Sequence, residues 1–147
     1  MSPTEFRTSV NQLLHDWAQT FEVPALDIAA GAVPVYYENG PDPDPAKLKL
    51  WVELETRFYS SSLIAVGRSD GRHTGALSIG CYIKSGEGTQ VPDAILQSLS
   101  SLLRRRRFGA NAYTQFPEWT IPPSPSFYGW RRSGLLVPFI LHEIATI

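Results

Sequence analysis

Residues 75–108, GALSIGCYIKSGEGTQVPDAILQSLSSLLRRRRF, predict a strand, a turn and a helix in immediate succession, and this unit decides the fold. Over residues 75–84 apolar side chains alternate with polar or small ones, the period of two that a half-buried strand requires. Gly86 and Gly88 then allow a tight turn. Apolar residues follow at helical spacing: Ile95, Leu96, Leu99, Leu102 and Leu103. The pattern predicts an amphipathic helix packed on a sheet, without a catalytic signature.

Length and composition predict one globular domain over residues 1–147. The chain is 43% hydrophobic and 18% charged, enough for one sizeable core and too short for two ordinary domains. The formal net charge of -1 argues against a strongly basic nucleic-acid binder, although residues 1–55 hold nine acids against three bases. That asymmetry fits a self-associating protein, and it equally fits an accident of sequence order.

The cysteine count and the hydropathy of the sequence indicate in which cellular compartment the protein is made. Cys81 is the single cysteine, so it forms no disulfide within the chain, and its place on the apolar face of a strand predicts a buried, inert thiol. No apolar run approaches the roughly 20 residues that span a bilayer, and the N-terminus carries acidic and polar residues instead of a signal peptide. We therefore expect a soluble protein made in a cytoplasm, with no membrane partner.

The first half of the chain predicts one helix, a short strand and a long hairpin. Ser2, Pro3 and Glu5 match a capping box that opens a helix with an apolar face over residues 6–21. A short strand at 34–38 precedes a proline-rich loop at 39–45, and unbroken alternation over 47–59 predicts a strand of unusual length. The hairpin tip is expected near Asp70 and Gly71, with the apolar patch 63–66 on its arm.

The second half predicts a short strand at 112–115, a stiff loop at 116–128 and a last strand at 134–144. That last strand is apolar on both faces, so both faces should be covered, the second by another subunit. Pro138 within it requires an edge or a bulge on one side. The whole sequence predicts an α+β domain: a mainly antiparallel or mixed sheet of four to five strands, two helices on one face, and a long protruding hairpin.

The sequence carries only weak motifs for metal binding, cofactor binding or catalysis. His15, His73 and His142 are too scattered for metal ligation, and no cysteine pair supports a zinc site, so neither a metal nor another cofactor is expected. The glycines of 80–88 fit neither a phosphate-binding loop nor a dinucleotide fingerprint. The adjacent His142 and Glu143 provide a base and an orienting carboxylate for a small hydrolase, but no nucleophile motif accompanies them. We expect the protein not to be an enzyme.

Four consecutive arginines, Arg104, Arg105, Arg106 and Arg107, follow the leucine-rich helix. At a helix C-terminus they are favourably placed against the helix dipole. The functional alternatives are contact with nucleic-acid phosphates and pairing with the acidic first third of a neighbouring chain. Consecutive helical residues point about 100° apart, so we expect that the four arginines cannot all contact one partner.

Several segments together resemble a known family. They are the N-terminal helix, the short strand VYYEN at 35–39, the long strand at 48–58, RHTGAL at 72–77, KSGEG at 84–88 before the leucine-rich helix, and Gly129-Trp130 followed by Val137-Pro138-Phe139. In this order they resemble the tail terminator or tail completion proteins of long-tailed bacteriophages, over most of the chain.

The resemblance implies a structural virion protein located at the junction between tail and neck. Such proteins form a homo-oligomeric ring, commonly a hexamer, that caps the head-proximal end of the tail tube, ends its polymerisation and joins it to the neck. The partners implied are the tail tube protein, a neck or head-completion protein, and DNA passing through the lumen without sequence specificity. No catalytic residue is implied.

On this reading the assembly interface lies on the hairpin arm, the arginines and the last strand. Its expected residues are Leu63, Ile64, Val66, Arg68, Arg104, Arg105, Arg106, Arg107, Leu136 and Ile140. The alternatives left open are a head–tail connector, a tail tube subunit, a small hydrolase and a nucleic-acid-binding domain.

Overall fold

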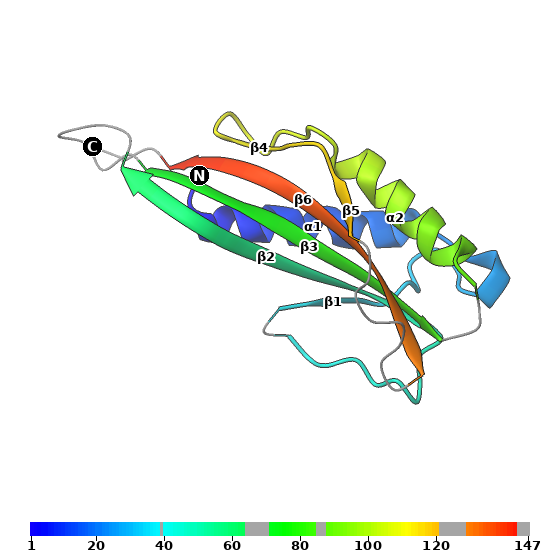
Figure 1. Ribbon diagram of the computed structural model, residues 1–147. Coiled ribbons are helices and arrows are strands. Elements are labelled where there is room, and N and C mark those ends of the chain that lie inside the picture. Colours follow the sequence, from blue (N-terminus) through cyan, green and yellow to red (C-terminus); the bar gives the residue numbers. More distant parts are fainter. Residues whose placement is uncertain (39, 64–70, 85–87, 121–128, 144–147) are drawn as a thin grey trace.

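The computed structural model describes residues 1–38, 40–63, 71–84, 88–120 and 129–143 (Figure 1). The helices are α1 (Pro3–Thr20), the short 3-10 helix η1 (Pro24–Leu26) and α2 (Gln90–Leu103). The strands are β1 (Val35–Tyr37), β2 (Leu50–Leu63), β3 (Gly71–Lys84), β4 (Ala112–Thr114), β5 (Glu118–Thr120) and β6 (Trp130–Glu143). The fold is α+β, as expected.

The strands form one mixed sheet in the order β1-β2-β3-β6-β4, with β5 also paired to β6. β1 runs parallel to β2, and every other pair is antiparallel. The described residues give six strands rather than four to five, because β5 lies within the segment expected to be a loop. Pro117 precedes β5, so this proline does not interrupt its pairing, and Trp119 and Thr120 favour extended structure.

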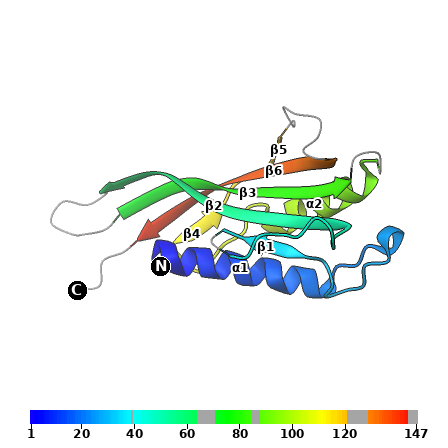
Figure 2. The same cartoon turned by 90° about the horizontal axis from the view of Figure 1, so that it is seen from below.

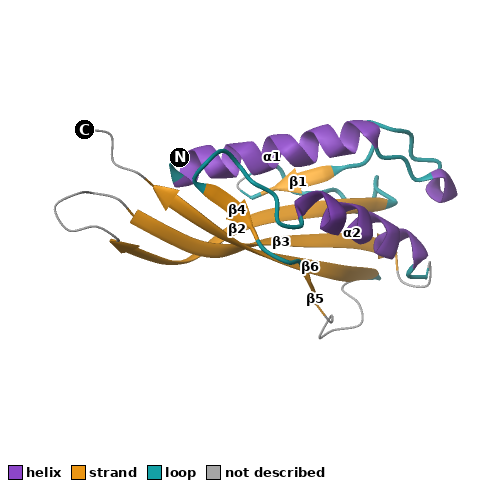
Figure 3. Cartoon of the chain, turned by 90° about the horizontal axis from the view of Figure 1, so that it is seen from above, coloured by secondary structure: helices purple, strands orange, loops and turns teal. Residues whose placement is uncertain are grey.

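Both principal helices cover the same face of the sheet, and the core lies between the two layers (Figure 3). α1 begins as predicted, since Ser2 Oγ accepts a hydrogen bond from the Glu5 backbone N–H at 3.2 Å. Its buried residues are Phe6, Val10, Leu14, Trp17 and Ala18. α2 buries Ile95, Leu96, Leu99 and Leu103 from the predicted face.

The inward faces of the long strands also agree with the predicted alternation. β3 buries Leu77, Ile79, Cys81 and Ile83, and β6 buries Leu135, Val137, Phe139 and Leu141. Full burial of one such aliphatic or aromatic side chain stabilises a fold by about 1.5–3 kcal/mol. The thiol of Cys81 is fully buried, and burial raises its pKa to about 12, so it is the inert cysteine expected.

The long hairpin of β2 and β3 is joined by a third strand. β6 pairs with β3 along its whole length, from Lys84 opposite Trp130 to Gly71 opposite Glu143. Figure 2 shows the far ends of β2 and β3 extending beyond the first turn of α1. The projecting arm is therefore three-stranded rather than a lone hairpin. Its expected tip at Asp70 lies outside the described residues.

Pro138 lies opposite a break in the sheet edge. β4 pairs with residues 139–141 of β6, and β5 pairs with residues 134–136. Neither strand pairs with Pro138, so the backbone N–H that proline lacks is not needed on that side. Its carbonyl accepts a hydrogen bond from the Gln115 N–H at 2.7 Å. The prediction of an edge at this proline is confirmed.

Candidate assembly surface

The face of the sheet opposite the helices carries most of the charged strand residues. The register aligns Glu55 of β2 with Ser78 of β3 and Leu136 of β6 in one row across this face. Neighbouring rows bring in Glu53, Arg57, Tyr82 and Arg132. Successive side chains of a strand point to opposite faces of the sheet. The core residues therefore face the helices, and these polar residues lie on the opposite face. The outward face is therefore polar and charged.

An acidic groove of about 430 Å³ lies between this face and the segment that follows β1. Its charged lining consists of the carboxylates Glu38, Asp42, Glu53 and Glu55 and the guanidinium groups of Arg57 and Arg132. Tyr36, Tyr37, Pro41, Pro43, Leu54, Ser78, Tyr82 and Leu136 complete the wall. Four carboxylates against two guanidinium groups leave the groove net acidic, so it favours a cationic partner. We refer to it below as the acidic groove.

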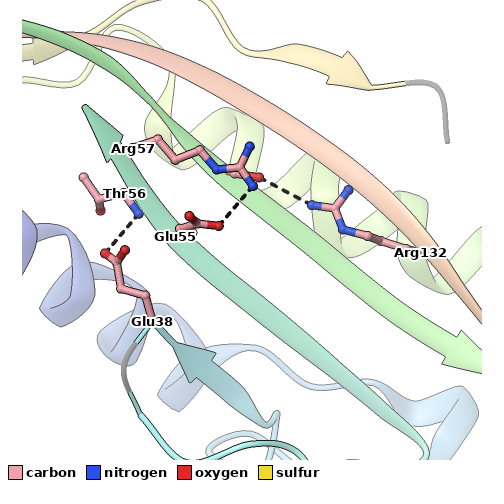
Figure 4. Close-up of polar contacts among 6 residues, drawn as sticks. Glu38, Glu55, Thr56, Arg57 and Arg132 are labelled. Carbon is pink, nitrogen blue, oxygen red and sulfur yellow. Dashed lines mark hydrogen bonds and ion pairs between the residues drawn. The ribbon is translucent and has the colours of Figure 1, made fainter. Parts of the chain in front are cut away.

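Polar contacts hold the walls of the acidic groove in place (Figure 4). Glu38, directly after β1, accepts a hydrogen bond from the Thr56 backbone N–H at 3.1 Å. Its Oε1 also lies 2.8 Å from Arg7 Nε of α1, an ion pair by distance without hydrogen-bond geometry. These contacts attach the edge strand to both layers of the domain, so Glu38 serves to position the wall.

The two arginines of the acidic groove are held by neighbours on the same face. Arg57 donates to Glu55 at 3.0 Å, and this contact raises the pKa of the Arg57 guanidinium. Arg132 lies over Gly80, where an added Cβ would approach Arg132 Nε to 2.6 Å, and it donates to Ser78 Oγ at 3.4 Å. A glycine is therefore required at position 80 for this arginine to lie against the sheet.

An aromatic cluster lies at the end of the acidic groove. Trp51 stacks on Tyr82 with ring centroids 4.8 Å apart, and its ring lies 4.5 Å from that of Trp130. The indole N–H of Trp51 donates to Glu53 Oε1 at 3.2 Å. Burial raises the pKa of Tyr82, and nearby Glu53 raises it further while Arg132 opposes the rise. The phenol therefore remains neutral, and Tyr82 is the member of the cluster that lines the groove, stacked on Trp51.

The arginines do not continue α2, which corrects the expectation of a helical run. The helix ends at Leu103, Arg104 is its C-cap, and Arg105 adopts a left-handed backbone with φ 47°. The chain then runs alongside β4: Arg105 N–H donates to the Gln115 carbonyl, and Thr114 N–H donates to the Arg106 carbonyl at 2.8 Å. We call residues 104–107 the arginine segment. All four of its side chains are exposed.

The arginine segment is accompanied by aromatic rings. The Arg104 guanidinium carbon lies 4.7 Å from the centre of the Phe116 ring, and that of Arg107 lies 6.0 Å from the centre of the Tyr113 ring. Arg105 and Arg107 line a shallow hollow of about 470 Å³ with Tyr113, Thr114, Gln115 and Phe116. Stacking on rings restricts long side chains that would otherwise sample many rotamers.

Glu143 contacts His73 and not the neighbouring His142, which adjacency in the sequence suggests as the partner in a small hydrolase. Glu143 Oε1 lies 3.0 Å from Nε2 of His73, a residue 70 positions earlier, rather than forming a pair with His142. His73 Nδ1 in turn lies 2.7 Å from Ser61 Oγ. Adjacent residues of a strand point to opposite faces, which explains why His142 and Glu143 do not act together. The three side chains link β2, β3 and β6 across the projecting arm.

The remaining residues of the expected interface differ in where they lie in the structure. Leu136 is half-buried and lines the acidic groove, whereas Ile140 is only 8% exposed and pairs across the sheet with Tyr113. Leu63 ends β2, and its side chain lies outside the described part, as do Ile64, Val66 and Arg68 entirely. Sequence reasoning missed the acidic groove, although the charged alternation of 53–57 was a visible signal.

Within the described residues no group of three or more His, Cys, Asp or Glu side chains is placed to hold a metal ion. Among those same residues, no helix has both the length and the apolarity that a membrane crossing requires.

Comparison with known proteins supports the fold alone. One solved structure, of a chain whose name carries no functional description, superposes with a TM-score of 0.70 over 99% of both chains at 16% identity. At that identity the likeness establishes a shared architecture and nothing about activity. No protein-family model and no curated protein matched the sequence.

Proposed function

We propose that the protein is a structural virion subunit that forms a ring at the head-proximal end of a phage tail tube. The observation that carries the proposal is the sheet face that no described helix covers, which presents a charged groove and half-buried Leu136, together with an exposed arginine segment at the edge beside β4. The segments that resemble tail terminators map onto α1, β1, β2, β3, α2 and β6, the elements that build this domain.

The proposed mechanism is cooperative capping. A ring of subunits, taken as six from the resemblance, matches the last ring of the tail tube on one side and offers a different surface to the neck on the other. Since the two sides differ, a further tube ring finds no matching surface, and growth ends. The arginine segment lies either between subunits or on the lumen, where it would contact DNA phosphates without reading sequence.

A head–tail connector and a tail tube subunit are the neighbouring possibilities within the same virion. The distinguishing experiment adds the purified protein to polymerising tube protein from the same virus and measures tube length by electron microscopy. A terminator shortens the tubes and appears as a ring at one end. A tube subunit lengthens or copolymerises with them, and a connector leaves their length unchanged while binding the neck protein. Either of the latter outcomes overturns the proposal.

A small hydrolase is the second candidate, favoured by the chain of contacts from Ser61 through His73 to Glu143. A serine hydroxyl, an imidazole and a carboxylate in hydrogen-bond sequence are the groups that nucleophilic hydrolysis uses. The test compares hydrolysis of p-nitrophenyl acetate by wild type, Ser61→Ala and His73→Ala. A rate that falls in both variants supports a hydrolase; equal rates in all three reject it.

A further inference from the structure

Opposite charge lies at opposite edges of the sheet. The carboxylates of the acidic groove lie on β2 and on the segment that follows β1, at one edge, although the groove itself extends across β3 to β6; the arginine segment runs alongside β4 at the other edge. We infer that Arg105 and Arg107 of one copy dock into the acidic groove of a second copy, against Asp42, Glu53 and Glu55. This inference rests on the proposed function and names the contact that closes its ring.

The arginine segment is prepared for such a contact. Its backbone is held by hydrogen bonds to β4, with Arg106 N–H donating to Thr114 Oγ1 at 2.8 Å. Arg105 and Arg107 line one hollow together, whereas Arg106 does not line it. A backbone that is already ordered loses little conformational entropy on binding, which favours association.

The acidic groove offers suitable acceptors. Within the described residues Asp42 and Glu53 take part in no ion pair, and Asp42 is exposed between Pro41 and Pro43, which restrict the loop that carries it. Arg57 and Arg132, the two arginines that line the groove, already donate hydrogen bonds to Glu55 and Ser78. A carboxylate binds a guanidinium group through charge-assisted and often bidentate hydrogen bonds.

The location of the two charged features determines the symmetry of the contact. A surface at one edge that binds a different surface at the other edge gives a heterologous, head-to-tail interface. Such an interface leaves one unoccupied groove and one unoccupied arginine segment on every dimer, so association continues into a closed ring where the rotation between neighbours closes, and into an open filament where it does not. Of these two assemblies, the closed ring is the one that the proposed function requires.

The test is a reciprocal charge reversal. One variant carries Arg105→Glu and Arg107→Glu, and the other carries Asp42→Lys and Glu55→Lys. Each alone is expected to self-associate about 10- to 1,000-fold more weakly, because like charges then face each other. An equimolar mixture is expected to recover assembly as alternating rings. Masses are measured by sedimentation velocity at low salt, and circular dichroism verifies that each variant folds.

Controls use exposed charges that line neither the acidic groove nor the hollow beside β4. Arg106→Glu with Arg131→Glu, and Glu22→Lys with Asp44→Lys, change the net charge by the same amounts and are expected to assemble as wild type does. The proposed contact is overturned if wild type and both reversed variants all assemble, or if mixing the two variants fails to restore assembly. In either case the ring proposal itself still stands. A wild-type protein that stays monomeric at all concentrations overturns both.

Discussion

At the residue scale, Gly75 marks the point where the inner face of the sheet has the least room. Phe58 and Phe139 pack over it, with ring centroids 5.3 Å apart in an edge-to-face arrangement. A Cβ at this position would lie 1.9 Å from the Arg57 carbonyl oxygen and 2.8 Å from Phe139 Cζ. The register of β2 shifts here, between Phe58 and Ser60. Glycine is therefore required by close packing of backbone and rings.

Gly75→Ala should lower the free energy of unfolding by at least about 1–3 kcal/mol, because the strand or the ring must move to admit a methyl group. Urea denaturation measures the loss. Gly71→Ala in the same strand is the matched control, since its nearest neighbours would lie at 3.7 and 3.8 Å, an ordinary contact. Equal effects of the two substitutions would contradict this account of Gly75.

Cys81 gives the protein a pH dependence in the alkaline range. Burial raises the pKa of its thiol from 9.0 to about 12, so above pH 9 the unfolded chain binds fewer protons than the folded one. Stability that is fully present below pH 9 is therefore lost as pH rises toward 12, with a slope of up to about 1.4 kcal/mol per unit.

Cys81→Ala should flatten this slope. The measurement is the difference between the unfolding free energies of wild type and variant at pH 8 and at pH 10.5. That comparison cancels the titration of tyrosines and lysines shared by both proteins. A difference between the two proteins that does not change with pH would show that the thiol ionises equally in both states.

At the scale of elements, Thr114 connects the end of α2 to the sheet edge. Its side chain is 1% exposed, its hydroxyl accepts from the Arg106 N–H at 2.8 Å, and it donates to the carbonyl of Leu103, the last residue of the helix. Carbonyl groups in the last turn of a helix lack partners within it. One threonine therefore caps the helix and positions the arginine segment.

Thr114→Val removes the hydroxyl while keeping the shape. We expect a loss of about 1–3 kcal/mol in unfolding free energy, because the Leu103 carbonyl loses this bond and the Arg106 N–H loses its acceptor in a buried site. The substitution should also speed backbone amide hydrogen exchange at residues 104–107 more than it does in β3. Thr74→Val is the control, since its hydroxyl contacts Ser60 at an exposed position. Unchanged exchange at 104–107 would reject the positioning role.

At the scale of the whole molecule, the two charged edges predict a salt-sensitive assembly. Raising the salt concentration from 0.1 to 1 M shortens the Debye length from about 10 Å to about 3 Å, which weakens attraction between partly exposed charges. Self-association measured by light scattering should therefore decrease over this range. Association that strengthens with salt would indicate that Leu136 and the aromatic residues of the same face dominate the contact.

Much of the fold follows from periodicity alone. Ser2, Pro3 and Glu5 place the start of α1, and the alternation about Leu77 and Ile79 fixes which face of β3 is buried, because these patterns depend on local geometry. β5 was missed because three residues between prolines carry too little pattern to separate a strand from a loop. The end of α2 was missed because arginine has good helix propensity, while Thr114, distant in sequence, holds the chain outside the helix.

The sequence by itself determined the class of fold, the two core-facing helices, the alternating strands and the inert cysteine, since each depends on the order of neighbouring residues. Only the tertiary structure decided which charges meet. It placed Glu143 against His73, brought Glu38, Asp42, Glu53 and Glu55 into one groove, and set the arginine segment at the opposite edge. The physical reason is that strand order and register, which connect residues far apart in the chain, are set by the packing of the whole sheet.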